Sequence, residues 1–254
     1  AIRTIRGGTG SGDPFNGGLS GGGDVMVDLS ERYNINIYDA FVKNGYDVTS
    51  ASFLEDFAQG YDKAKLAFGS NPMSTFAYPE MELTQEIIDQ SKVETDTAIY
   101  VISRNAGEGA DRSATTKSST MTNEKGETIT FEVGDYELTE LEKANLTLVG
   151  KNFDKVAVVL NVGGVIDTKF MDEIEGLDAL LNMSQAGQES GTAAFDILTG
   201  VVNPSGKLTS TWAKNYSDYP ASATLGANDG DELLELYNEG IYVGYRYFDT
   251  FNIT

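Results

Sequence analysis

Two short apolar segments constrain the fold of this chain more than any other feature. Residues 97–103 (TAIYVIS) and 155–162 (KVAVVLNV) are apolar at nearly every position rather than at alternate ones. A strand that is apolar on both faces is typical of a parallel sheet that helices cover on both sides. Segments with helical periodicity separate the two. The alternation therefore predicts an α/β fold, a three-layer α/β/α sandwich with a mostly parallel sheet of about six strands.

Further elements are expected from periodicity and turn signals. We expect helices that run from Ser30 to a stop at Gly45, over 53–68, from Thr84 to Val93, over 137–149 and over 191–199. Additional strands are expected at 46–51, 177–183 and 207–212. The glycine-rich opening, residues 1–24, predicts a long loop, and alternation around Gly126 predicts a small surface hairpin near 113–135.

The composition excludes several kinds of chemistry. The 254 residues include no cysteine and no histidine, which removes disulfides, thiolate or imidazole metal sites and triads with an imidazole base. The formal net charge of -21 would repel a nucleic-acid backbone. No apolar run approaches the ~20 residues that span a bilayer. We therefore expect carboxylate, hydroxyl, lysine or arginine chemistry, without a cofactor, a metal, a nucleic-acid partner or a membrane.

Three known motifs are imitated in this sequence but not satisfied. Neither GGTGSGD nor LSGGGDV has the G-x-G-x-x-G spacing of a dinucleotide site. Residues 200–208 (GVVNPSGKL) have one residue too many for a phosphate loop and Leu208 in place of its hydroxyl. Residues 18–22 (GLSGG) match a serine nucleophile elbow, but no strand precedes them and no histidine exists. These failures disfavour a nucleotide-binding α/β regulator.

One polar segment directly follows the first buried strand. It runs from Arg104 to Arg112 (RNAGEGADR), and ligands of open α/β sheets bind beyond the carboxyl ends of strands. Two glycines flank Glu108, so its backbone can approach a ligand closely, and Arg104, Asp111 and Arg112 could orient or tune its carboxyl group. A solvated loop held by an Arg–Asp salt bridge explains the same residues, and acidic loops are common in so acidic a chain.

Five blocks give nearly the whole chain a resemblance to a known family: AIYVISRNAGEGADR (98–112), YELTELEK (136–143), VAVVLNVGGVID (156–167), QAGQESGTAAFDILTGVVNPSGKLTSTW (185–212) and EGIYVGYRYFDTF (239–251). They resemble the C-terminal type α/β sandwich domain of family 3 glycoside hydrolases, which include β-glucosidases and β-xylosidases. The opening RGGTGSGDP is similar to the loop after that domain's first strand. The resemblance implies that residues 1–254 form a single such domain of a larger enzyme, without the first strand.

The resemblance also implies the mechanism of a retaining β-glycosidase, which uses two carboxylates. In this family the nucleophilic Asp lies on a separate (β/α)8 barrel, and no segment here matches that barrel's motif. The general acid/base of similar members is the Glu of a GEGxDR motif, which is Glu108 in this chain, with Arg104, Asp111 and Arg112 in support. The implied substrate is a β-glucoside or short β-linked oligosaccharide, from which a terminal non-reducing β-D-glucosyl or xylosyl residue is removed.

The same resemblance leads to expectations about the chain on its own. Its opening is similar to variants in which the sandwich domain precedes the barrel. We expect the isolated chain to be inactive and to expose the opening loop, Glu108 and residues 237–251 on one face for the barrel. Glu108 itself should then be exposed, with an ordinary pKa. The alternative is a carbohydrate-binding or interaction module without catalysis.

Overall fold

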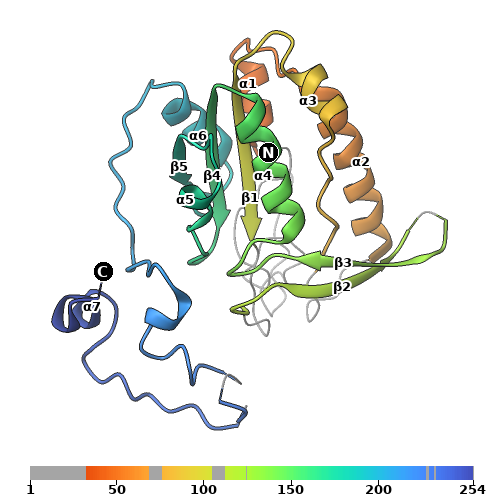
Figure 1. The fold of residues 1–254 in the computed structure, drawn as a ribbon. Helices are drawn as coiled ribbons and strands as arrows, with labels where there is room; N and C mark the ends of the chain where they lie inside the picture. The colour runs from red at the N-terminus through yellow and green to blue at the C-terminus, as the bar shows by residue number, and fades with distance from the viewer. Residues whose placement is uncertain are drawn as a thin grey trace, which may run out of the picture.

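The computed structural model describes residues 33–68, 76–104, 112–123, 125–226, 229–231 and 233–253. The helices of this part are α1 (Ile37–Lys43), α2 (Ala51–Phe68), α3 (Gln85–Ser91), α4 (Glu140–Asn152), α5 (Phe170–Glu173), α6 (Ser190–Leu198), the 3-10 helix η2 (Tyr216–Asp218) and α7 (Tyr245–Phe251). The strands are β1 (Thr97–Arg104), β2 (Lys117–Thr122), β3 (Thr128–Val133), β4 (Lys155–Val162) and β5 (Ala179–Asn182). Figure 1 shows the resulting arrangement, in which helices lie against a central sheet. The α/β prediction is confirmed.

The central sheet has the strand order β1-β4-β5, and both pairings are parallel. Thr97 of β1 lies opposite Lys155 of β4, and the register continues until Arg104 lies opposite Val162. The prediction that the two apolar strands are neighbours in a parallel sheet is therefore confirmed. The carboxyl ends of β1 and β4 lie side by side, so the segments that follow them start at the same edge of the sheet.

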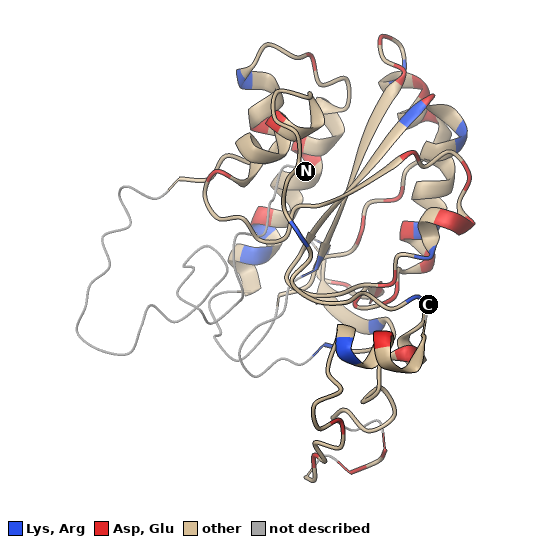
Figure 2. Cartoon of the chain, turned by 90° about the vertical axis from the view of Figure 1, so that its left-hand side faces the viewer, with Lys and Arg blue, Asp and Glu red and all other residues tan. Residues whose placement is uncertain are grey.

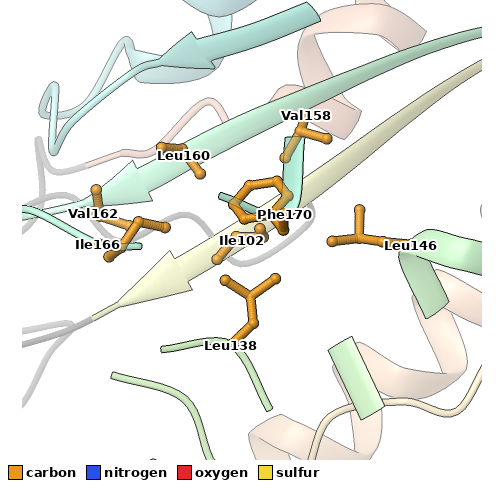
Figure 3. Close-up of a cluster of buried hydrophobic side chains, with 8 residues drawn as sticks. All are labelled: Ile102, Leu138, Leu146, Val158, Leu160, Val162, Ile166 and Phe170. Atoms are coloured by element: carbon orange, nitrogen blue, oxygen red, sulfur yellow. The ribbon is translucent and has the colours of Figure 1, made fainter. Parts of the chain in front are cut away.

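Helices cover both faces of β4, which explains why this strand is apolar throughout. On one face Leu160 belongs to a buried cluster with Leu146 of α4 (Figure 3). On the other face Val159 packs with Ile37 of α1 and Ala194 of α6. Successive side chains of a strand point to opposite faces, so each apolar residue of β4 meets one of the two helical layers.

The described sheet has three parallel strands, and the prediction of about six is wrong for this part of the chain. Residues 46–51 form a turn instead of a strand, because the Tyr46 amide donates to the Phe41 carbonyl and the Ala51 amide donates to the Val48 carbonyl. A cavity of about 820 Å³ lies between this turn and β1. Without a neighbouring strand in that space, the segment has no ladder to join.

The strand predicted at 207–212 is also not formed. This stretch follows Pro204 and is mostly exposed, with Leu208 at 58%. Proline lacks an amide donor, and the alternating pattern after it has no partner strand beside β5 in the described sheet. The alternation is therefore misleading here, because a local pattern alone does not supply a hydrogen-bonding neighbour.

Local signals at the other elements were more informative. The predicted hairpin is formed by β2 and β3, which pair from Lys117 opposite Val133 to Thr122 opposite Thr128. Gly126 adopts a φ of +78° in its turn, a conformation that favours glycine. The first helix stops just before Gly45, as predicted, with Asn44 as its C-cap. The predicted start at Ser30 is wrong, because residues 33–36 are not helical and α1 begins at Ile37, where Asn36 caps it by accepting from the Asp39 amide. Ser30 itself and the glycine-rich opening lie outside the described residues.

Candidate active site

The candidate site lies at the carboxyl edge of β1 and β4. Glu108 and Asp111 lie outside the described residues, so their predicted roles remain predictions. Arg104 and Arg112, the residues at the two ends of the RNAGEGADR segment, are described. Their contacts show how the chain is held where it leaves β1 and where it continues toward β2.

Arg104 is a buried side chain whose guanidinium is fully engaged by the protein. Its Nη1 and Nη2 donate to Glu142 Oε1 and Oε2 at 2.7 and 2.8 Å, a bidentate pair in which the two side chains are 6% and 7% exposed. Its Nε donates to the Asp135 carbonyl at 2.9 Å, and Nη1 also reaches the Ser103 carbonyl. Arg104 therefore joins β1 to α4 and does not present its charge to solvent.

Glu142 is positioned for this pair by the start of α4. Thr139 caps the helix by accepting from the Glu142 amide at 3.0 Å, and Glu142 Oε2 accepts from the Thr139 amide at 2.9 Å. This reciprocal capping box holds the Glu142 carboxylate at the start of α4, where it also binds Arg104. Removing one partner of a buried ion pair typically costs about 3–5 kcal/mol of stability. Replacing either Arg104 or Glu142 alone should therefore destabilise the fold.

Arg112 is held by the segment between β3 and α4 and by the segment that follows β4. Its Nε donates to Asp135 Oδ1 at 2.7 Å, and its Nη1 donates to the Val165 carbonyl at 2.6 Å. Asp135 Oδ2 accepts from the Ser113 amide at 2.6 Å and pairs with Lys117 Nζ at 3.0 Å. The arginine–aspartate salt bridge expected for this region exists, but its described acid is Asp135. Arg112 Nη2 is buried and has no partner within the described part.

Two glycines leave room for these arginines. A Cβ on Gly134 would overlap the guanidinium of Arg104, and a Cβ on Gly164 would lie 2.9 Å from Arg112 Nη1. Gly164 belongs to the segment that follows β4, so the carboxyl edges of both strands contribute to this packing. The close approach requires residues without a side chain at both positions.

The cavity beside β1 contains an acid with an unusual proton affinity. Glu80 lines the cavity, and its Oε1 accepts from the Tyr100 hydroxyl at 3.2 Å. Desolvation, with a smaller effect of the Glu142 charge, raises the pKa of Glu80 from 4.5 to about 7, although the Tyr100 hydrogen bond opposes this change. Glu80 is nevertheless a solvent-exposed residue, so this raised pKa belongs to a carboxyl group that solvent still reaches.

The acidic excess of the chain is dispersed. Figure 2 shows Asp and Glu over several helices and loops, and the described residues include no group of three or more acidic side chains that could hold a metal ion. No helix among the described residues is long and apolar enough to cross a membrane.

Sequence inspection missed Asp135 and Glu142 as members of this site. The Thr139-x-x-Glu142 spacing is a recognised capping-box signal and could have drawn attention to Glu142. No local signal connects either acid to Arg104 or Arg112, because the contacts span 23 to 38 residues of sequence. The predicted residues Arg104 and Arg112 do come together, through Asp135.

The described residues define an α/β domain with two anchored arginines, Arg104 and Arg112, at the carboxyl edge of its parallel sheet, the edge at which open α/β sheets bind ligands. The glycosyl hydrolase family 3 C-terminal domain matches residues 3–245, and the chain belongs to this family. It is 37% identical over 240 residues to β-glucosidase A of Butyrivibrio fibrisolvens, covering 92% of this chain and 28% of that protein. The resemblance to family 3 is thereby confirmed.

A further relative and a solved structure are similar to this chain over nearly its whole length. A β-glucosidase of Ruminococcus albus is 34% identical over 241 residues, which is 94% of this chain and 22% of that protein. The structure of β-glucosidase 3B from Thermotoga neapolitana in complex with glucose superposes with a TM-score of 0.74 at 32% identity, over 100% of this chain and 31% of that one. The chain thus spans less than a third of the length of these relatives.

Proposed function

We propose that this chain is the acid/base-bearing domain of a retaining β-glucosidase and that Glu108 is the general acid/base. The observation that carries the proposal is the match to the family 3 C-terminal domain together with the braced ends of the segment that contains Glu108. Arg104 and Arg112 support that segment by anchoring its ends, and Asp111 is proposed as a further supporting residue. The relatives named β-glucosidase support a β-glucoside or short β-linked oligosaccharide as substrate.

The proposed reaction needs two carboxyl groups on opposite sides of the glycosidic bond. An aspartate of a partner (β/α)8 barrel attacks the anomeric carbon while Glu108 donates its proton to the departing oxygen. Glu108 then accepts a proton from the water that attacks the glycosyl-enzyme, and the sugar leaves with retained configuration. This division assigns the nucleophile to another part of the polypeptide and the proton transfer to this chain.

The proposal treats residues 1–254 as one α/β sandwich unit of a larger enzyme. The outer edge of β1 is unpaired in the described sheet and borders the cavity, so it offers a place for a further strand. The small fraction of each relative that the chain covers agrees with a multidomain parent. The order of the sandwich and barrel domains stays a prediction.

The experiment uses the full-length polypeptide that carries this chain. Glu108→Ala should slow hydrolysis of glucosides with poor leaving groups by ~10²- to 10⁴-fold, and activated aryl glucosides far less, because only the former need proton donation. Azide should partly restore turnover of the activated substrate by replacing base-assisted water. Glu94→Ala, on the exposed turn after α3, is the control and should change neither rate.

Equal losses on both substrate types without azide rescue would refute the acid/base role of Glu108. Binding of β-linked sugar by the full-length protein without any hydrolysis would instead favour the carbohydrate-binding alternative. Comparing kcat/KM for aryl β-glucoside and aryl β-xyloside decides which sugar is preferred.

A further inference from the structure

Strand β1 is less buried than its sequence predicts. Its segment is apolar on both faces, like that of β4, yet only Ile102 and Arg104 of its eight residues are buried, whereas six of the eight residues of β4 are. Strand β4 has a parallel partner on each side, and β1 pairs only with β4 among the described strands. A sequence suited to the middle of a sheet therefore lies at the edge of the described one.

The open edge of β1 borders a large apolar cavity. The cavity, of about 820 Å³, lies between β1 and the turn at 46–51, and aromatic side chains from other segments line it. These side chains are Phe41 of α1, Phe57 and Tyr61 of α2, and Tyr78. Only Ala58 of the 18 residues of α2 is buried, so the apolar face of this helix is also left partly exposed.

The two helical layers show how a further strand would connect to the sheet. Helix α4, which joins β1 to β4, packs on one face, where Leu146 and Leu160 belong to one buried cluster. Helix α1 packs on the opposite face, where Ile37 belongs to the cluster of Val159. Crossovers between parallel strands are right-handed in about 98% of cases, so a crossover on the opposite face runs across the sheet in the opposite direction. A strand that precedes α1 is therefore followed by one that lies farther from β4.

This handedness gives the order of strands at the cavity. The segment that follows α1 is 46–51, for which the sequence pattern predicted a strand, and it lies across the cavity from β1. The strand that precedes α1 therefore belongs between 46–51 and β1. Its direction follows from the start of α1, because the Ile35 amide donates to the Gln188 carbonyl at 2.9 Å, in the segment that follows the carboxyl end of β5. A strand that ends at this edge of the sheet runs parallel to β1.

The first residues of the chain do not have the composition of such a strand. A parallel strand that is covered on both faces is a nearly continuous apolar run. Between residues 1 and 32, no stretch longer than three residues is free of glycine and of charged side chains. The chain covers only 28% of β-glucosidase A of Butyrivibrio fibrisolvens, so that relative has much further sequence outside the match. These facts assign the strand to the polypeptide that precedes residue 1.

We propose that the groove between β1 and residues 46–51 binds a parallel, apolar β-strand from the part of the same polypeptide that precedes Ala1. The strand pairs with β1 through backbone hydrogen bonds and offers its other edge to residues 46–51, which then have the neighbour that strand formation requires. Its side chains fill the cavity between α1 and α2. The inference concerns the assembly of the domain and does not depend on the role of Glu108.

The test extends the chain by the ~12 residues that precede Ala1 in the full-length polypeptide, which is enough for a strand of typical length. The extended chain should melt more than about 4 °C above the 254-residue chain. Amide hydrogen exchange at 97–104 and 46–51 should become at least ~10-fold slower, because pairing on the open edge suppresses local opening. Exchange at 155–162 is the internal control and should change less, since β4 already has a partner on each side.

A second extension of the same length, with prolines at its two central positions, separates strand pairing from a general effect of added residues. Proline lacks the amide that a central strand needs, so this extension should leave melting and exchange near the values of the unextended chain. Equal effects of the two extensions, or no change at 97–104 with the natural one, would contradict the proposal. Slower exchange at 97–104 without a change at 46–51 would contradict the placement of the strand between them. Dimerisation of the unextended chain with protection of 97–104 would assign the groove to a second copy and would overturn the proposal.

Discussion

The sheet region (residues 33–199) and the C-terminal arm (residues 200–253) differ in how far their large apolar side chains are buried. Leu146 of α4 is completely buried, whereas Leu233 and Tyr237 of the arm are 98% and 89% exposed. Figure 1 shows the arm, in blue, running away from the sheet after α6. Large exposed apolar areas usually mark interaction surfaces. The comparison indicates that the sheet region folds around its own core, while the described part of the arm leaves several large apolar side chains exposed.

The largest expected contrast is between two leucine truncations. Leu146→Ala should destabilise the chain by about 2–5 kcal/mol, because it removes a side chain from a packed core. Leu233→Ala should change the free energy of unfolding by less than about 0.5 kcal/mol. Urea titrations followed by circular dichroism measure both values. Equal losses would mean that Leu233 is packed in solution, and would contradict the contrast between the sheet region and the arm.

A glycine pair gives the next contrast. A Cβ on Gly191 at the start of α6 would overlap the carbonyl of Asn36, whereas a Cβ on Gly206 in the arm would meet nothing within 4 Å. Gly191→Ala should therefore cost about 1–3 kcal/mol through overpacking between α6 and the start of α1. Gly206→Ala should be nearly neutral. A thermal melt that ranks the two variants in the reverse order would show that the α1–α6 contact is looser than described.

The smallest expected effect concerns pH and the cavity of the sheet region. Because the folded chain raises the pKa of Glu80 to about 7, it holds this proton to higher pH than the unfolded chain does. Stability should therefore fall as pH rises from about 4.5 to 7. Glu80→Gln should melt close to the parent at pH 5 and higher than the parent at pH 8. Glu94→Gln, on an exposed turn, should keep the parent's pH dependence; a flat parent profile would refute the assignment.

Much of the sheet region was predictable because its signals are local. The continuous apolar character of 97–103 and 155–162 indicated two strands that are buried on both faces, and these strands are paired in parallel along their whole length. The helical spacing of apolar residues also predicted helices α2, α4 and α6. The strands expected at 46–51 and 207–212 failed because strand formation also needs a neighbour, which a local pattern does not report.

The candidate site was predictable only in part, for the same reason. Its location followed from the rule that ligands bind at the carboxyl ends of strands, and Arg104 and Arg112 were identified from the segment itself. Asp135 and Glu142 were missed because their relation to these arginines exists only in the folded chain. The arginines also proved to be anchors, with guanidinium groups bound to protein acceptors, which residue type alone does not reveal.

The most direct test of the account is to measure hydrolysis of an aryl β-glucoside by the isolated 254-residue chain and by the full-length polypeptide that carries it. We propose that this chain supplies the proton-transferring carboxyl group and that a partner domain supplies the nucleophile. We therefore expect turnover by the full-length polypeptide and none by the isolated chain above the level of its Glu108→Ala variant. Equal kcat/KM values for the isolated chain and the full-length polypeptide would contradict it.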